Sequence, residues 1–186
     1  MPGTVRPAAL VAILILCWTV SGCRPGGRAP SYIDLLHQFP SAQKRSQFAP
    51  GEAFALFDAE VGGVVKSSLR TCGASRIIWS IRVPRNAVLR TAIAPAAGSG
   101  TTAPAITFRI GISDRRHYEM LFEREFPGAG PGTPNSWRPV TISLSGYAGW
   151  QWSLFYRPWQ IVWDLVFTAG GPGCGYWAEP RIQVAA

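Results

Sequence analysis

Alternation of apolar and polar residues over long stretches is the feature that most limits how this chain can fold. Residues 106–113 read Ile-Thr-Phe-Arg-Ile-Gly-Ile-Ser, and residues 76–83 place Ile77, Trp79, Ile81 and Val83 at every second position. A period of two indicates half-buried β-strands. Related stretches predict further strands at 88–93, 117–126, 139–144, 150–156, 162–168 and 176–184. In residues 117–126 we expect Tyr118, Met120 and Phe122 on one face and Glu119, Glu123 and Glu125 on the other.

Segments rich in glycine and proline separate these strands. The longest are residues 95–104, 127–135 and 170–173. Many short strands punctuated by such turns, with almost no helix, predict an all-β fold, an antiparallel β-sandwich of the jelly-roll type. We assign residues 46–186 to this sandwich and find no internal repeat and no second domain.

The stretch before the sandwich has a different pattern. Residues 24–30 are Arg-Pro-Gly-Gly-Arg-Ala-Pro, which is typical of a flexible tether. Ser31 followed by Asp34 resembles a capping box, and Pro40 would end a helix. We therefore predict a tether over residues 23–45 that contains one short helix at 31–39.

The N-terminus has the anatomy of a secretory signal. Arg6 precedes an apolar stretch at residues 8–20, which is shorter than the roughly 20 residues that a membrane-spanning helix needs. Val20-Ser21-Gly22-Cys23 resembles the lipobox of bacterial lipoprotein precursors. The resemblance implies removal of residues 1–22, lipidation of Cys23 by thioether-linked diacylglycerol and an acyl chain such as palmitate, and attachment to a bacterial membrane outside the cytoplasm. Arg24, in place of an aspartate, would imply the outer membrane in a Gram-negative cell. The alternative is an ordinary signal peptide in which Cys23 is incidental.

The remaining cysteines form a pair under this interpretation. Cys17 is lost with the signal and Cys23 is acylated, which leaves Cys72 and Cys174 in an oxidising compartment. We predict a disulfide between them. Neither has a neighbouring histidine or cysteine, so no metal site is predicted.

The basic charge of the mature chain is spread along it. Without Arg6 it has 17 of the 18 Lys and Arg residues against 10 Asp and Glu residues, and no basic run is longer than a pair. A nucleic-acid partner would require a clustered basic stripe, so none is predicted. A basic surface outside the cytoplasm is compatible with weak contact to acidic lipids or polyanionic glycans.

The second half of the chain carries a recognisable pattern. It consists of Trp137, the segment Val140-Thr141-Ile142-Ser143-Leu144-Ser145-Gly146-Tyr147-Ala148-Gly149 and the segment Tyr176-Trp177-Ala178-Glu179-Pro180-Arg181-Ile182. This pattern resembles bacterial galactose-binding-domain-like jelly rolls, which include carbohydrate-binding modules. The resemblance spans roughly residues 77–184 and implies a sandwich with a binding role. Ser143 and Ala178 stand where aspartate and glycine are usual. We expect Tyr147 to pin its turn by ring packing and a hydroxyl hydrogen bond, and Pro180 to mark an edge or a bulge.

Aromatic residues provide the candidate binding site. Sugar sites combine flat aromatic faces with polar side chains, and the second half of this chain is rich in tryptophan and tyrosine. Trp159, in the proline-containing segment 157–160, is the first candidate for an exposed loop ring, followed by Trp137 and Tyr176. The alternative is that most of these rings belong to the core.

Catalytic signals are absent from the sequence. His37 and His117 are far apart in sequence, and no nucleophile elbow, zinc-protease motif or phosphate loop is present. We predict neither an enzyme nor a cofactor. The leading hypothesis is non-catalytic binding of a glycan or envelope polymer by a lipid-anchored domain. The alternative is a lipoprotein that docks an envelope protein and has no sugar affinity.

Overall fold

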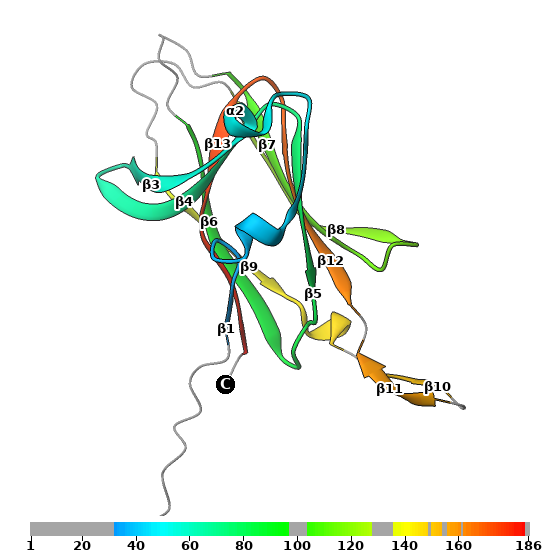
Figure 1. The fold of residues 1–186 in the computed structure, drawn as a ribbon. Helices are drawn as coiled ribbons and strands as arrows, with labels where there is room; N and C mark the ends of the chain where they lie inside the picture. The colour runs from blue at the N-terminus through cyan, green and yellow to red at the C-terminus, as the bar shows by residue number, and fades with distance from the viewer. Residues whose placement is uncertain are drawn as a thin grey trace, which may run out of the picture.

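Two antiparallel β-sheets pack face to face in the computed structural model, which confirms the predicted β-sandwich (Figure 1). The structure describes residues 32–96, 104–127, 136–148, 150–153, 156–160 and 162–184, with the backbone only for 150–153 and 156–160. Residues 1–31, including Cys23, lie outside the described part.

The first sheet has the strand order β3-β4-β13-β6-β9, with β1 beside β13. Its strands are β1 (Tyr32–Asp34), β3 (Phe54–Val61), β4 (Val64–Cys72), β6 (Ala87–Pro95), β9 (Arg138–Ser143) and β13 (Cys174–Val184). The second sheet has the order β2-β5-β12-β7-β8. Its strands are β2 (Gln43–Ser46), β5 (Ser75–Ile81), β7 (Ile106–Ser113), β8 (Tyr118–Phe126) and β12 (Trp163–Gly170).

The remaining elements are short. A hairpin of β10 (Trp150–Ser153) and β11 (Tyr156–Gln160) takes the place of the single strand predicted at 150–156. The helical elements are η1 (Phe39–Ser41), α2 (Pro50–Ala53) and η2 (Ser145–Tyr147). Within the described residues, no helix has the length and hydropathy needed to cross a bilayer.

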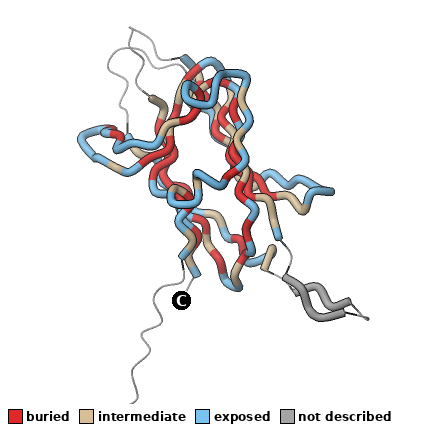
Figure 2. The backbone as a smooth tube through the Cα atoms, viewed as in Figure 1, coloured by how far each residue is buried: buried red, intermediate tan, exposed pale blue. Residues whose placement is uncertain are grey.

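The core lies between the two sheets, where the alternating residues were expected. The side chains of Ile77, Trp79, Phe108 and Ile110 are at most 2% exposed. Figure 2 shows burial along the facing strands, whereas the tip of the β3–β4 hairpin is exposed. Within the core, Trp177 of β13 crosses to the second sheet, with ring centroids 4.8 Å from Phe108 and 4.6 Å from Phe167.

The prediction of a helix at residues 31–39 is wrong. Tyr32–Asp34 is a strand paired with Arg181–Gln183 of β13. The Asp34 carboxylate accepts hydrogen bonds from the backbone N–H groups of Leu36 and His37, at 2.9 and 3.1 Å, and so closes a turn instead of capping a helix. Leu35 is fully buried, and its N–H donates to the Pro180 carbonyl at 3.0 Å. Residues 32–46 therefore belong to the sandwich, and the predicted boundary at residue 46 is too late.

Two β-bulges change which residues face the core. In β13, one extra residue lies between Ala178 and Arg181, and Glu179 has a φ of 46°. Of the two alternatives predicted for Pro180, an edge or a bulge, the structure has the bulge. In β8, Ile110 pairs with Phe122 whereas Gly111 pairs with Met120, so Leu121 is the extra residue. The uniform alternation predicted for 117–126 is therefore wrong beyond Met120.

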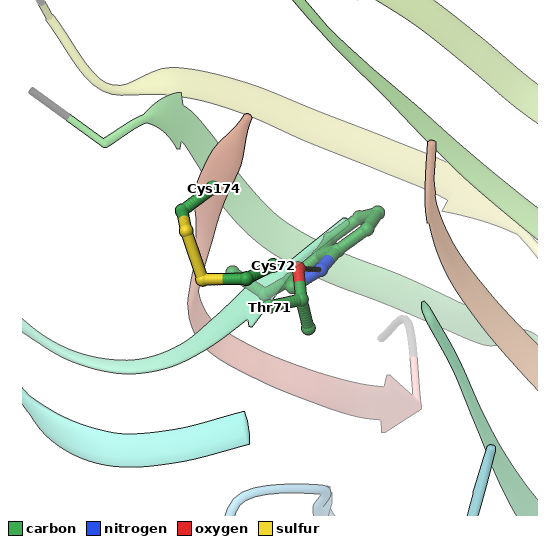
Figure 3. Close-up of a disulfide and its surroundings, with 4 residues drawn as sticks. Thr71, Cys72 and Cys174 are labelled. Carbon is green, nitrogen blue, oxygen red and sulfur yellow. Dashed lines mark hydrogen bonds between the residues drawn. A yellow bond between two sulfur atoms is a disulfide. The ribbon is translucent and has the colours of Figure 1, made fainter. Parts of the chain in front are cut away.

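A disulfide joins Cys72 and Cys174, as predicted (Figure 3). The two residues lie directly opposite each other at the paired ends of β4 and β13. Beside the disulfide, Trp177 Nε1 donates a hydrogen bond to Thr71 Oγ1 at 3.1 Å. The bridge joins residues 102 positions apart, so it links the beginning and the end of the sandwich.

Replacing both Cys72 and Cys174 with alanine is expected to lower the free energy of unfolding by about 2–5 kcal/mol, because the unfolded chain loses a long covalent loop. Denaturant unfolding of the wild type and the double variant, without reductant, measures the difference. Adding reductant should bring the wild type to the stability of the variant and leave the variant unchanged. Equal stability of the two proteins without reductant would contradict the role assigned to this bridge.

Candidate functional site

Three aromatic rings gather on the outer face of the first sheet. Tyr176 of β13 points away from the core because its neighbour Trp177 points into it. The ring of Phe57, from β3, lies 5.4 Å from that of Tyr176, and the ring of Trp137 lies 6.3 Å from it. We call Phe57, Trp137 and Tyr176 the aromatic cluster.

The aromatic cluster is held in place and is partly open to solvent. Trp137 Nε1 donates to the Val64 carbonyl at 2.8 Å, which fixes the indole over the β3–β4 hairpin. Phe57 is 40% exposed, and Trp137 and Tyr176 are of intermediate exposure. The cross-strand row that contains Phe57 continues through the small residues Ser68, Ala178 and Ala92. These three residues are 1%, 0% and 8% exposed, so the sheet beside the rings is covered, and the rings themselves are the part of this face that is partly open to solvent.

Charged groups lie on the same face. Arg70 is the direct cross-strand partner of Tyr176, and its Nε is buried without a hydrogen-bond partner. Lys66, two positions away from Ser68 on β4, forms an ion pair with Glu179 at 2.8 Å. The face therefore combines aromatic surfaces with hydrogen-bonding groups, which is the combination that a sugar ring requires.

The predicted binding residues separate into two groups. Trp137 and Tyr176, which are 39 positions apart, meet in the aromatic cluster. Trp159 lies on β11, where it pairs with Gln151, so the loop predicted at 157–160 is instead a strand. Pro158 is compatible with that position because a two-stranded hairpin has free edges. The ring of Trp159 lies outside the described side chains, and its role stays a prediction.

Phe57 was missed by the sequence analysis. The available signal was a weak alternation in which Phe57 shares a face with Ala55 and Ala59. The outward direction of that face becomes clear only from the pairing of Phe57 with Ser68.

A polar groove of about 560 Å³ lies on the other sheet. It is lined by Gln38, Ser41, Ala42, Gln43, Arg45, Ile78, Trp79, Ser80, Arg115 and Asp164. Ser80 Oγ donates to Asp164 Oδ1 at 2.6 Å, and Arg115 Nε lies 3.5 Å from Asp164 Oδ2. Its lining residues come from four separated stretches of chain, so only the strand pairing reveals the groove.

Tyr147 forms a contact between the turn at η2 and the second sheet. Its ring packs edge-on against Trp163, with centroids 5.2 Å apart. Burial, followed by a hydrogen bond with Glu119 and the charge of that carboxylate, raises the pKa of Tyr147 to about 12. This confirms the pinning role expected of Tyr147. It also gives Glu119 a structural partner, although the sequence predicts this side chain on one strand face with Glu123 and Glu125.

The β7–β8 turn is held by Asp114. Its carboxylate accepts backbone hydrogen bonds from Arg116 at 2.8 Å and His117 at 2.7 Å. These two hydrogen bonds hold the pKa of Asp114 below its usual value, and the bond from His117 has the larger effect. In the part of the chain that the structure describes, no three His, Cys, Asp or Glu side chains gather as metal ligands would.

Comparisons with known proteins support the fold. No protein-family model matches this chain, and no curated protein sequence does. Among solved structures, the K1 cleaved adhesin domain of Lys-gingipain from Porphyromonas gingivalis W83 is similar, with a TM-score of 0.53 and 11% sequence identity over 85% of this chain and 99% of that domain. CBM51 from Clostridium perfringens GH95, solved with methyl-galactose, gives a TM-score of 0.49 and 13% identity over 82% and 99% of the two chains. At 11% identity, the similarity to the K1 domain establishes the sandwich fold alone.

Replacing Glu119 with glutamine is expected to lower the pKa of Tyr147 from about 12 toward its ordinary value near 10, because the negative charge that opposes phenolate formation is lost. Since the pKa of the folded protein is raised, the stabilisation by Tyr147 is complete below about pH 10 and is lost as the pH rises toward 12. The NMR shift of Tyr147 Cζ during a pH titration measures this pKa. Glu125→Gln serves as the control and should leave it unchanged. An unchanged pKa in Glu119→Gln would refute the assigned contact.

Proposed function

We propose that this domain is a non-catalytic binding module for a glycan or envelope polymer, held outside the cytoplasm by a lipid on Cys23. The aromatic cluster is the observation that carries the proposal. Flat rings that are partly open to solvent match the C–H faces of sugar rings, and Arg70, Lys66 and Glu179 add hydrogen-bonding groups to the same face of the sheet.

The site is preorganised for such a ligand. Trp137 is fixed by its hydrogen bond to Val64, and Tyr176 is fixed by its position in a central strand beside the disulfide. Side chains that are already ordered lose less conformational entropy on binding, so more of the contact energy remains as affinity. A fold can support many functions, so the proposal depends on the site. The description of the similar K1 domain as an adhesin agrees with a binding role.

A protein-docking role is the second candidate, and one observation favours it. The β3–β4 hairpin carries several exposed apolar side chains, namely Leu56, Phe57, Val64 and Val65, which are 40–60% exposed. Figure 1 shows this hairpin extending away from the sandwich. An exposed apolar patch of this kind is typical of a protein interface, in which the aromatic cluster would lie at the margin.

The aromatic cluster is tested by binding to a panel of polysaccharides and to a glycan array. We expect Trp137→Ala and Tyr176→Ala each to weaken binding about tenfold, because each removes a stacking face worth roughly 1.4 kcal/mol. Tyr118→Ala is the matched control, since Tyr118 is an exposed aromatic residue on the opposite sheet. Binding that persists in both cluster variants would exclude this site.

The second candidate predicts a different outcome in the same experiments. If the hairpin docks a protein, Val65→Asp should abolish recovery of a crosslinked partner, whereas no polysaccharide should bind the wild type. Sugar binding that is unaffected by Val65→Asp supports the first candidate.

The lipid anchor is tested separately. Replacing Cys23 with alanine is expected to move the protein from the membrane fraction to the soluble fraction, because two or three acyl chains, at about 0.8 kcal/mol per buried CH₂, are lost. Immunoblotting of fractionated cells measures the shift, with Cys72→Ala as a control that keeps the lipobox. Unchanged membrane association of Cys23→Ala would exclude the anchor.

A further inference from the structure

The polar groove on the second sheet lies away from the aromatic cluster and has a different chemistry. Its walls come from β2, β5, β12 and the β7–β8 turn. It is lined by two arginines, Arg45 and Arg115, by neutral hydrogen-bonding groups and by a single carboxylate, Asp164.

Two arginines on this face are placed at positions where their charges reduce the stability of the fold. Arg45 of β2 is the direct cross-strand partner of Arg76 of β5. Like charges in such a pair destabilise a sheet. Among the described residues neither arginine has a carboxylate partner, and Arg45 contacts only Gln43 Oε1, at 3.4 Å. By contrast, Arg109 on the same face is paired with Glu123 at 2.7 Å.

Arg115 occupies an unfavourable backbone conformation at the edge of the groove. Its φ is 73°, a left-handed value that favours glycine. Ser113 Oγ accepts a hydrogen bond from the Arg115 N–H at 3.0 Å, and Asp114 holds the rest of the turn. The side chain reaches back to Asp164 and is 72% exposed, which leaves most of its guanidinium donors available. Strain of this kind is found where a residue serves function rather than stability.

From these observations we propose that the groove binds an acidic saccharide, whose anionic group contacts Arg115 and Arg45 and whose hydroxyl groups contact Asp164 and the neighbouring glutamines. Guanidinium groups bind carboxylates and sulfates with two parallel hydrogen bonds. Asp164, near Ser80 and Arg115, accepts hydrogen bonds from hydroxyls. A surface for a bare polyanion or an anionic membrane would gain nothing from a carboxylate among its lining residues. A ligand with both hydroxyl groups and a negative charge matches both the two arginines and the hydrogen-bonding groups Asp164, Gln38 and Gln43.

The experiment compares four probes bound by the full chain. They are polygalacturonate, which has carboxylates and hydroxyls, polyphosphate as a polyanion without sugar hydroxyls, dextran as a neutral polymer, and vesicles containing phosphatidylglycerol. We expect the wild type to bind polygalacturonate and not dextran. Arg115→Gly and Arg45→Gln should each weaken polygalacturonate binding about tenfold, since each removes a charged hydrogen-bond donor.

Controls separate the site from general charge. Arg90→Gln removes the same charge from an exposed position on the opposite sheet and should change binding less than about twofold. Arg115→Gly introduces the residue that the backbone at 115 prefers, so its melting temperature should not fall, and a loss of binding cannot come from unfolding. Asp164→Asn should weaken binding to polygalacturonate and strengthen binding to polyphosphate.

Three results would overturn the proposal. The first is that wild type does not bind polygalacturonate. The second is an equal loss in all three arginine variants, which would show general electrostatic attraction. The third is binding to polyphosphate or to vesicles that exceeds binding to polygalacturonate and is no weaker in Arg115→Gly. Tyr176→Ala should leave polygalacturonate binding unchanged, so failure of the aromatic cluster and failure of this groove are distinguishable.

Discussion

The indole of Trp177 is the contact on which the sandwich and its aromatic cluster depend. It projects from β13 of the first sheet and packs against Phe108 and Phe167 of the second, with no exposed surface. A buried N–H requires an acceptor, and Thr71 Oγ1 supplies it from β4. This hydrogen bond sets the orientation of the indole beside the disulfide. Because side chains alternate along a strand, an inward Trp177 directs Tyr176 outward, toward Trp137.

The bulge in β13 allows two residues that a regular strand would direct to opposite faces of the sheet to point into the same core. Trp177 and Ile182 are five positions apart, so in a regular strand they would face opposite sides, yet both are buried. The extra residue between Ala178 and Arg181 restores the phase. Pro180 has no N–H to donate and is accommodated where the β4 pairing of β13 ends and the β1 pairing begins. The same bulge brings Glu179 within reach of Lys66.

Local sequence patterns predicted most strands correctly, but they did not predict which residues gather in the aromatic cluster and in the groove. The strands at 76–83 and 106–113 follow from hydrophobic alternation, which reports directly on burial. The predicted helix at 31–39 failed because an aspartate near the start of a segment can close a turn as well as cap a helix, and the open edge of β13 is invisible in the sequence. Trp137 and Tyr176 were identified singly. Phe57, the groove and the Arg45–Arg76 pair all depend on register between distant strands, which a single sequence does not encode locally.

The position of β1 has a mechanical consequence. Any pull on the chain before Tyr32 is applied first to the three residue pairs between β1 and β13 and to the hydrogen bond from Leu35 to Pro180. Detaching β1 would release the chain as far as β2 and lengthen the segment that precedes the rest of the sandwich. Further release from the N-terminal side would pass through β2, β3 and β4 and would stop at Cys72, because its disulfide to Cys174 closes the loop that follows. Under load, the strands before Cys72 would thus detach one after another, whereas the residues between Cys72 and Cys174 stay within a covalently closed loop.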